Sequence, residues 1–151
     1  MKKIIMIILS FIIMNEIFAG IKDETNTFDF KAIRRIDRSI EKIESSKKIK
    51  IYINIFDGEE SFHPEDPQRT VIFDIQKINK DEISVELKFS EDLNLENKSV
   101  ELSAILDNYK KELYEGKYEE YIVGVLDSID KVLASEEAEE KEIEAEENIE
   151  K

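Results

Sequence analysis

The stretch VELSAILDNYKKELYEGKYEEYIVGVLDSIDKVLA, residues 100–134, decides the fold of this chain. Its apolar residues recur in steps of three and four, which places them on one face of a helix. Gly116 divides them into two sets, and glycine ends a helix at little steric cost. We therefore predict two amphipathic helices joined at Glu115-Gly116-Lys117. Their apolar faces comprise Leu102, Ile105, Leu106, Tyr109 and Leu113, then Tyr118, Ile122, Val125, Leu126, Ile129, Val132 and Leu133.

The same helical spacing occurs once more, from Phe28 to Ser46, with Thr27 as the expected N-cap. Apolar residues alternate instead at 49–56, 70–77 and 82–89, and a period of two predicts strands. The last two strands are separated by turn-forming residues only, so we expect an antiparallel hairpin. Residues 21–27 are expected to form a short polar lead.

This order of elements predicts the fold class. A small sheet with an apolar face needs helices to cover it. We expect an α/β fold in three layers, with a central sheet of about three strands, one hairpin among them, covered by helices on both sides.

The first 19 residues have the layout of a secretory signal peptide. Lys2 and Lys3 precede the apolar run Ile4–Ile13, and Ala19 is small enough to precede a cleavage site. The alternative is an uncleaved anchor, but a spanning helix needs about 20 apolar residues and Glu16 interrupts the run. We expect export to the periplasm or the cell exterior, cleavage near Ala19, and no membrane span in the mature chain.

Charge and cysteine content restrict the classes of function. The net charge is −14, and removing residues 1–19 takes away two Lys and one Glu, which leaves −15. Such a surface repels nucleic acid and is compatible with cations or a basic partner, although solubility alone also explains it. The chain has no cysteine, which excludes a thiol nucleophile and a thiolate metal site.

The acidic segment 135–151 differs from the rest of the chain. It holds nine Glu and two Lys, a net charge of −7. Glu and Ala favour helix, whereas charge excess without a wide apolar face favours fraying or disorder. The segment is compatible with an interaction tail for a basic partner, a cation buffer or a solvated tail.

The order of elements and three local strings resemble the TPM domain family. These are exported or membrane-tethered bacterial domains with relatives in the thylakoid lumen. Residues 105–133 carry the strongest likeness, because Tyr114-Glu115-Gly116-Lys117-Tyr118 looks like the family's closing turn and Gly124 like its later glycine. Residues 33–56 and Val85-Glu86-Leu87 are the other two strings. The resemblance implies a TPM-like α/β domain over residues 28–134.

Two departures from the family pattern affect what the resemblance implies. Residues 57–69 are too short for the helix that family members carry there, so the middle region is shortened. Lys88 and Ser90 stand where the family typically has glycines. Some relatives are acid phosphatases and some bind divalent cations. The resemblance thus implies an exported cell-envelope accessory or binding module, whose partner is an envelope protein or a basic molecule; the alternative is a divalent-metal-dependent phosphatase-like enzyme.

Carboxylates gather in the loops after the first and third predicted strands. Oxygen ligands of this kind are the ones that Ca²⁺ and Mg²⁺ prefer, whereas the alternative is solvated loop charge. The single histidine, His63, is either a ligand or general acid beside them or an exposed loop residue. We expect weak binding of Ca²⁺ or Mg²⁺ at these loops and assign no catalytic residue. The candidate ligands are Asp57, Glu59, Glu60, Glu65, Asp66, Glu91 and Asp92.

Overall fold

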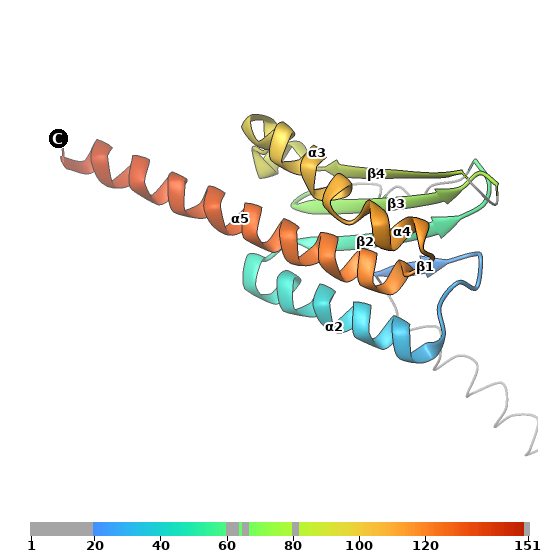
Figure 1. Ribbon diagram of the computed structural model, residues 1–151. Coiled ribbons are helices and arrows are strands. Elements are labelled where there is room, and N and C mark those ends of the chain that lie inside the picture. The colour runs from blue at the N-terminus through green and yellow to red at the C-terminus, as the bar shows by residue number, and fades with distance from the viewer. Residues whose placement is uncertain (1–19, 60–63, 65–66, 80–81, 150–151) are drawn as a thin grey trace, which may run out of the picture.

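The computed structural model describes residues 20–59, 64, 67–79 and 82–149, with backbone only for 96, 138–140 and 142–149. Its strands are β1 (Ile21–Asp23), β2 (Lys50–Phe56), β3 (Thr70–Lys77) and β4 (Ile83–Phe89), in the order β1-β2-β3-β4 (Figure 1). β1, β2 and β3 run parallel, and β4 is antiparallel to β3. The α/β class, the predicted hairpin and the three predicted strands are confirmed.

The fourth strand, β1, falls in the segment that was expected to be a polar lead. It pairs along only three residues, from Ile21 opposite Ile53 to Asp23 opposite Ile55. Just before β1, the carbonyl oxygen of Gly20 accepts a hydrogen bond from the Ile53 N–H group at 2.7 Å. The folded body therefore begins ahead of Phe28.

The helices are α2 (Phe30–Lys47), α3 (Ser99–Asn108), α4 (Lys110–Tyr114) and α5 (Tyr118–Ile149). Asp29, not Thr27, caps α2, because its side chain accepts a hydrogen bond from the Ala32 N–H group at 2.8 Å. α2 ends at Lys48 in the left-handed conformation. Gly116 also has a positive φ, of 74°, which confirms its predicted role as the turn before α5.

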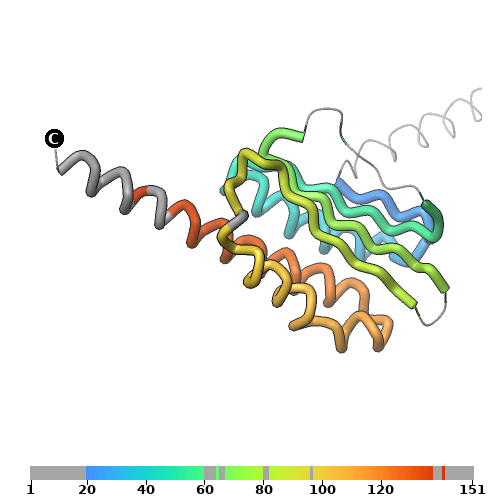
Figure 2. Tube along the Cα trace, turned by 90° about the horizontal axis from the view of Figure 1, so that it is seen from above, coloured from blue at the N-terminus to red at the C-terminus, as the bar shows by residue number. Residues whose placement is uncertain are grey.

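All four helices cover one face of the sheet. On that face the side chains of Ile51, Ile53 and Ile55 in β2 and of Val71, Phe73 and Ile75 in β3 are at most 1% exposed. They share one core with residues of α2, α3, α4 and α5, and Figures 1 and 2 show the helices as one layer against the sheet. Within the described residues, the prediction of helices on both sides is wrong. The opposite face carries the polar side chains of Asn54, Asp74, Glu86 and Lys88 beside Phe56 and Ile72, so it lacks the continuous apolar surface that a helix would bury.

The first predicted helix of the pair is broken at Tyr109, whose ring packs against a glycine of α5. The Tyr109 ring lies directly against Gly124 of α5, where an added Cβ atom would stand 2.5 Å from the ring. The Tyr109 hydroxyl lies 3.3 Å from the Ser128 hydroxyl. The turn between α3 and α4 thus coincides with the residue whose ring packs against α5.

Helix α5 extends well beyond the body of the domain. Its buried residues end at Leu133, and ion pairs of Glu136 with Lys98 and of Glu137 with Lys47 follow. The backbone then remains helical to Ile149 and projects away from the sheet and from α2 (Figure 1). None of the described helices is both long and apolar enough to cross a membrane.

Candidate functional site

The structure separates the two acidic loops that were predicted to form a cation site. Asp57 and Glu59 follow the end of β2, whereas Glu91 and Asp92 follow the end of β4, and all four are exposed. Because β2 is parallel to β3 and β4 is antiparallel to it, the loops that follow β2 and β4 lie at opposite ends of the strands. Strands of seven residues hold them roughly 20 Å apart. One ion cannot contact both loops.

Glu60, Glu65, Asp66 and His63 lie outside the described residues. Among the residues that are described, no three His, Cys, Asp or Glu side chains are grouped to hold a metal ion. Of the predicted ligands, Asp57 and Glu59 thus lie in the loop after β2, and Glu91 and Asp92 lie after β4, at the opposite end of the strands.

Asp92 has a structural partner. Its two carboxylate oxygens accept hydrogen bonds from the Arg69 N–H group at 3.0 and 2.9 Å. Arg69 has a positive φ of 45°, so Asp92 holds the strained residue that leads into β3. Hydrogen bonding from the Ser90 hydroxyl, and then from the Arg69 backbone, lowers the pKa of Asp92. These contacts favour the ionised carboxylate in a local structural role.

A polar cluster occupies the face of the sheet opposite the helices, called the open face below. Asp74 is buried there, and its carboxylate accepts hydrogen bonds from the Asn54 side-chain amide at 2.7 Å and from Lys88 at 2.8 Å. Lys88 also pairs with Glu86 at 3.1 Å. A hollow of about 180 Å³ adjoins the cluster, and it includes Glu59 among its lining residues.

The chemistry of this cluster is that of matched charges. The hydrogen bond to Asp74 raises the pKa of Lys88, so its amine stays protonated at neutral pH. A protonated lysine bonded to a carboxylate is neither a nucleophile nor a general base. The cluster therefore supplies a fixed set of hydrogen-bonding groups to the hollow. The sequence signal for it is Asp74 within the apolar run VIFDI, a position that alternation of apolar residues alone does not identify as functional.

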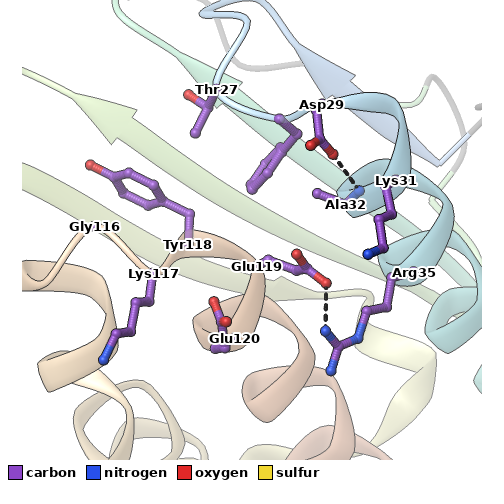
Figure 3. Close-up of a pocket in the computed structure, with 11 residues that line it drawn as sticks. Thr27, Asp29, Lys31, Ala32, Arg35, Gly116, Lys117, Tyr118, Glu119 and Glu120 are labelled. Carbon is purple, nitrogen blue, oxygen red and sulfur yellow. Dashed lines mark hydrogen bonds and ion pairs between the residues drawn. The ribbon is translucent and has the colours of Figure 1, made fainter.

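A larger hollow of about 480 Å³ lies where the N-termini of α2 and α5 meet (Figure 3). First turns of helices carry N–H groups without partners inside the helix, and both helices present such turns here. Arg35 of α2 and Glu119 of α5 point toward each other across the hollow and pair at 2.9 Å. On its rim, Lys77 stands over the Tyr118 ring, 4.7 Å from the centroid.

The charges around this larger hollow are balanced. Lys31, Arg35 and Lys117 are matched in number by acidic lining residues, Asp29, Glu119 and Glu120. Lys117 also pairs with Glu115 at 2.6 Å. An anionic ligand would have to displace these carboxylates, so the hollow lacks the excess positive charge that usually attracts one.

A strong charge imbalance lies on the projecting part of α5, residues 138–149, called the acidic arm below. Six Glu and one Lys give it a net charge of −5. Twelve helical residues span about 18 Å. At its base, Lys98 and Glu136 are both largely buried and pair at 3.9 Å, and Lys47 pairs with Glu137 at 3.0 Å. The arm is thus a continuous extension of a helix that is fixed in the core.

No family model matches the chain, and no curated protein matches it.

Proposed function

We propose that this chain is an exported accessory module of the cell envelope that binds a basic partner through the acidic arm. The export and the envelope location rest on residues 1–19 and on the resemblance to TPM domains. The observation that carries the binding role is the continuation of α5 beyond the body as a helix with a net charge of −5.

Physical chemistry supports a cationic ligand for this arm. Glu residues recur four apart at 140 and 144 and at 142 and 146, and like charges at that spacing destabilise a helix. The arm avoids the cost of helix nucleation because α5 is already formed in the core. Cations along the arm would relieve the repulsion, so binding of a basic partner and helix stability support each other.

A basic peptide tests the proposal directly. The probe is a ten-residue oligolysine, titrated by calorimetry at physiological salt into the mature chain, residues 20–151, and into a chain that ends at Glu137. We expect the shorter chain to bind at least tenfold more weakly. Because oligolysine binds many acidic surfaces, the comparison needs a control of equal net charge.

The matched control neutralises five exposed carboxylates of the body and leaves the arm intact. Both changes shift the net charge by +5, so only the position of the lost charge differs. We expect the control to lose much less affinity than the truncated chain. Equal losses would mean that the peptide responds to net charge alone and would overturn the proposal. The substituted residues are Glu41, Glu91, Glu101, Glu120 and Asp127.

Export is tested separately. The full chain, expressed in bacteria, should be recovered from the envelope or the medium with a mass that lacks about the first 19 residues. Recovery of the intact chain from the cytoplasm would contradict the envelope assignment and leave the arm experiment unaffected.

A further inference from the structure

The two edges of the sheet are unequal. β1 forms one edge and is three residues long, whereas β4 forms the other and is seven residues long. A short edge strand offers little for another chain to pair with, but a long one presents a row of free N–H and C=O groups. Figure 2 looks onto β4, and no described segment passes over it in that view.

The hairpin register decides which backbone groups of β4 face outward. The Ser90 N–H group donates to the Thr70 carbonyl at 2.9 Å, so these two residues form a hydrogen-bonded pair. Such pairs alternate along an antiparallel ladder, so Ser84, Glu86 and Lys88 also bond to β3. The outward N–H and C=O groups belong to the alternate residues Ile83, Val85, Leu87 and Phe89. No hydrogen bond joins these groups to another described residue.

The side chains of the same four residues lie on the helix-covered face and are only partly buried. The cross-strand partners of Phe89, Leu87 and Val85, which are Val71, Phe73 and Ile75 in β3, are fully buried. The difference arises because the sheet ends at β4. A further strand beside β4 would remove this apolar surface from water, which is favourable.

The charges on β4 indicate which chain supplies the additional strand. Glu86 and Lys88 flank Leu87 on the open face of the sheet. If two copies pair antiparallel about a two-fold axis at Leu87, Glu86 of each copy faces Lys88 of the other. Opposite charges placed directly across a strand pair stabilise it, whereas an axis at Glu86 would set two carboxylates against each other.

We propose that two copies of this chain pair antiparallel along β4, with the two-fold axis at Leu87, and join their sheets into one. Leu87 then pairs with Leu87 of the second copy, and Val85 pairs with Phe89. All of these residues have outward N–H and C=O groups, so each pair exchanges two hydrogen bonds. The outward backbone groups and the partly buried side chains favour pairing through these residues, and the charge pattern favours the axis at Leu87.

Because the chain has no cysteine, single Cys substitutions report the register. Leu87→Cys places two thiols on the axis, in a hydrogen-bonded pair whose Cα atoms are about 5.5 Å apart, within disulfide reach. Glu86→Cys is the matched control, since its counterpart is Lys88 and the two positions 86 lie more than about 7 Å apart. Under mild oxidation we expect a covalent dimer from Leu87→Cys, at least tenfold faster than from Glu86→Cys or from Val100→Cys. Val100 is 81% exposed and lies in α3.

Sedimentation equilibrium of residues 20–151 over a concentration series measures the dimer itself. Leu87→Pro should give a monomer with an unchanged circular dichroism spectrum, because the N–H group that it removes points away from β3. Glu86→Lys should weaken the dimer about tenfold, since it turns two attractive pairs into repulsive ones. A monomer at every concentration, or faster cross-linking at position 86 than at position 87, would overturn the proposal.

Discussion

The two faces of the central sheet are built on different principles. The helix-covered face buries Ile, Val and Phe side chains at most 1% exposed, and its stability comes from removing apolar surface from water. The open face centres on Asp74, whose carboxylate is satisfied by Asn54 and Lys88. One face therefore holds the fold together, and the other retains polar groups in a fixed arrangement. The contrast shows where substitution should be costly and where polar chemistry is retained.

The largest expected effect compares two isoleucines of β3 that point to opposite faces. Ile75 is fully buried against the helices, and Ile72 is 6% exposed on the open face. Truncation of a packed Ile to Ala costs its transfer free energy plus a cavity, so we expect Ile75→Ala to lose about 4 kcal/mol and Ile72→Ala about 2 kcal/mol. Urea unfolding at neutral pH measures both. Equal losses would mean that the open face is packed as tightly as the covered one.

The next effect tests whether Asp74 organises the open face. Asp74→Ala leaves the buried Asn54 amide without its acceptor and takes from Lys88 its closer carboxylate, so we expect a loss of about 2 kcal/mol. Glu86→Ala is the control, because Glu86 pairs with the same lysine but is largely exposed. That change should cost no more than about 0.5 kcal/mol. A similar loss for both variants would argue against a buried organising role for Asp74.

Sequence periodicity predicted the covered face well and the open face poorly. Alternating apolar residues in β2 and β3 and three-four spacing in α2 and α5 report burial, which is a local pattern. The position of all helices on one face depends instead on connections. The turn at Gly116 was predictable because its cause, a positive φ, is local. The break at Tyr109 was not, because it depends on contact with Gly124.

The acidic loops failed to converge for a reason of strand direction. The hairpin β3–β4 was predicted, but the direction of β2 relative to β3 was not, and the connection 57–69 permits either. If β2 were antiparallel to β3, the C-terminal ends of β2 and β4 would lie side by side at the same end of the strands. The observed parallel pairing places Glu59 and Asp92 at opposite ends of the strands. β1 was missed because three residues, two of them polar, carry too little alternation to predict a strand.

A pH dependence distinguishes the covered face from the open one in a second way. The Tyr121 hydroxyl is buried beside Phe73 and has no hydrogen-bond partner among the described residues. Burial raises the pKa of Tyr121 to about 12. An unfolded tyrosine titrates near pH 10, so above pH 10 the unfolded chain loses this proton before the folded chain does. The folded state therefore keeps its full stability below pH 10 and loses stability as pH rises toward 12. The slope attributable to Tyr121 is about 1.4 kcal/mol per pH unit.

Tyr121→Phe isolates this contribution. We expect urea unfolding of the variant between pH 9 and pH 11 to lack that part of the alkaline loss. At neutral pH the variant should be about 1 kcal/mol more stable, because it removes a desolvated hydroxyl without a partner. An unchanged alkaline slope, together with a loss of stability at neutral pH, would show that the hydroxyl is satisfied in the folded chain.

The smallest expected effect concerns cation binding by the loop after β2, which contributes Glu59 to the hollow of about 180 Å³ on the open face. The prediction of weak Ca²⁺ or Mg²⁺ binding now rests on the loop after β2 alone. Glu91 and Asp92 lie at the opposite end of the strands, and the Asp92 carboxylate accepts hydrogen bonds from the Arg69 N–H group. Carboxylates on one loop, without a rigid cage, bind Ca²⁺ at millimolar concentration. A calcium titration followed by NMR should therefore shift the amide signals of Asp57 and Glu59 and leave those of Glu91 and Asp92 in place. Equal shifts of the amide signals in both loops would indicate screening of surface charge, and no shift at millimolar Ca²⁺ would exclude the site.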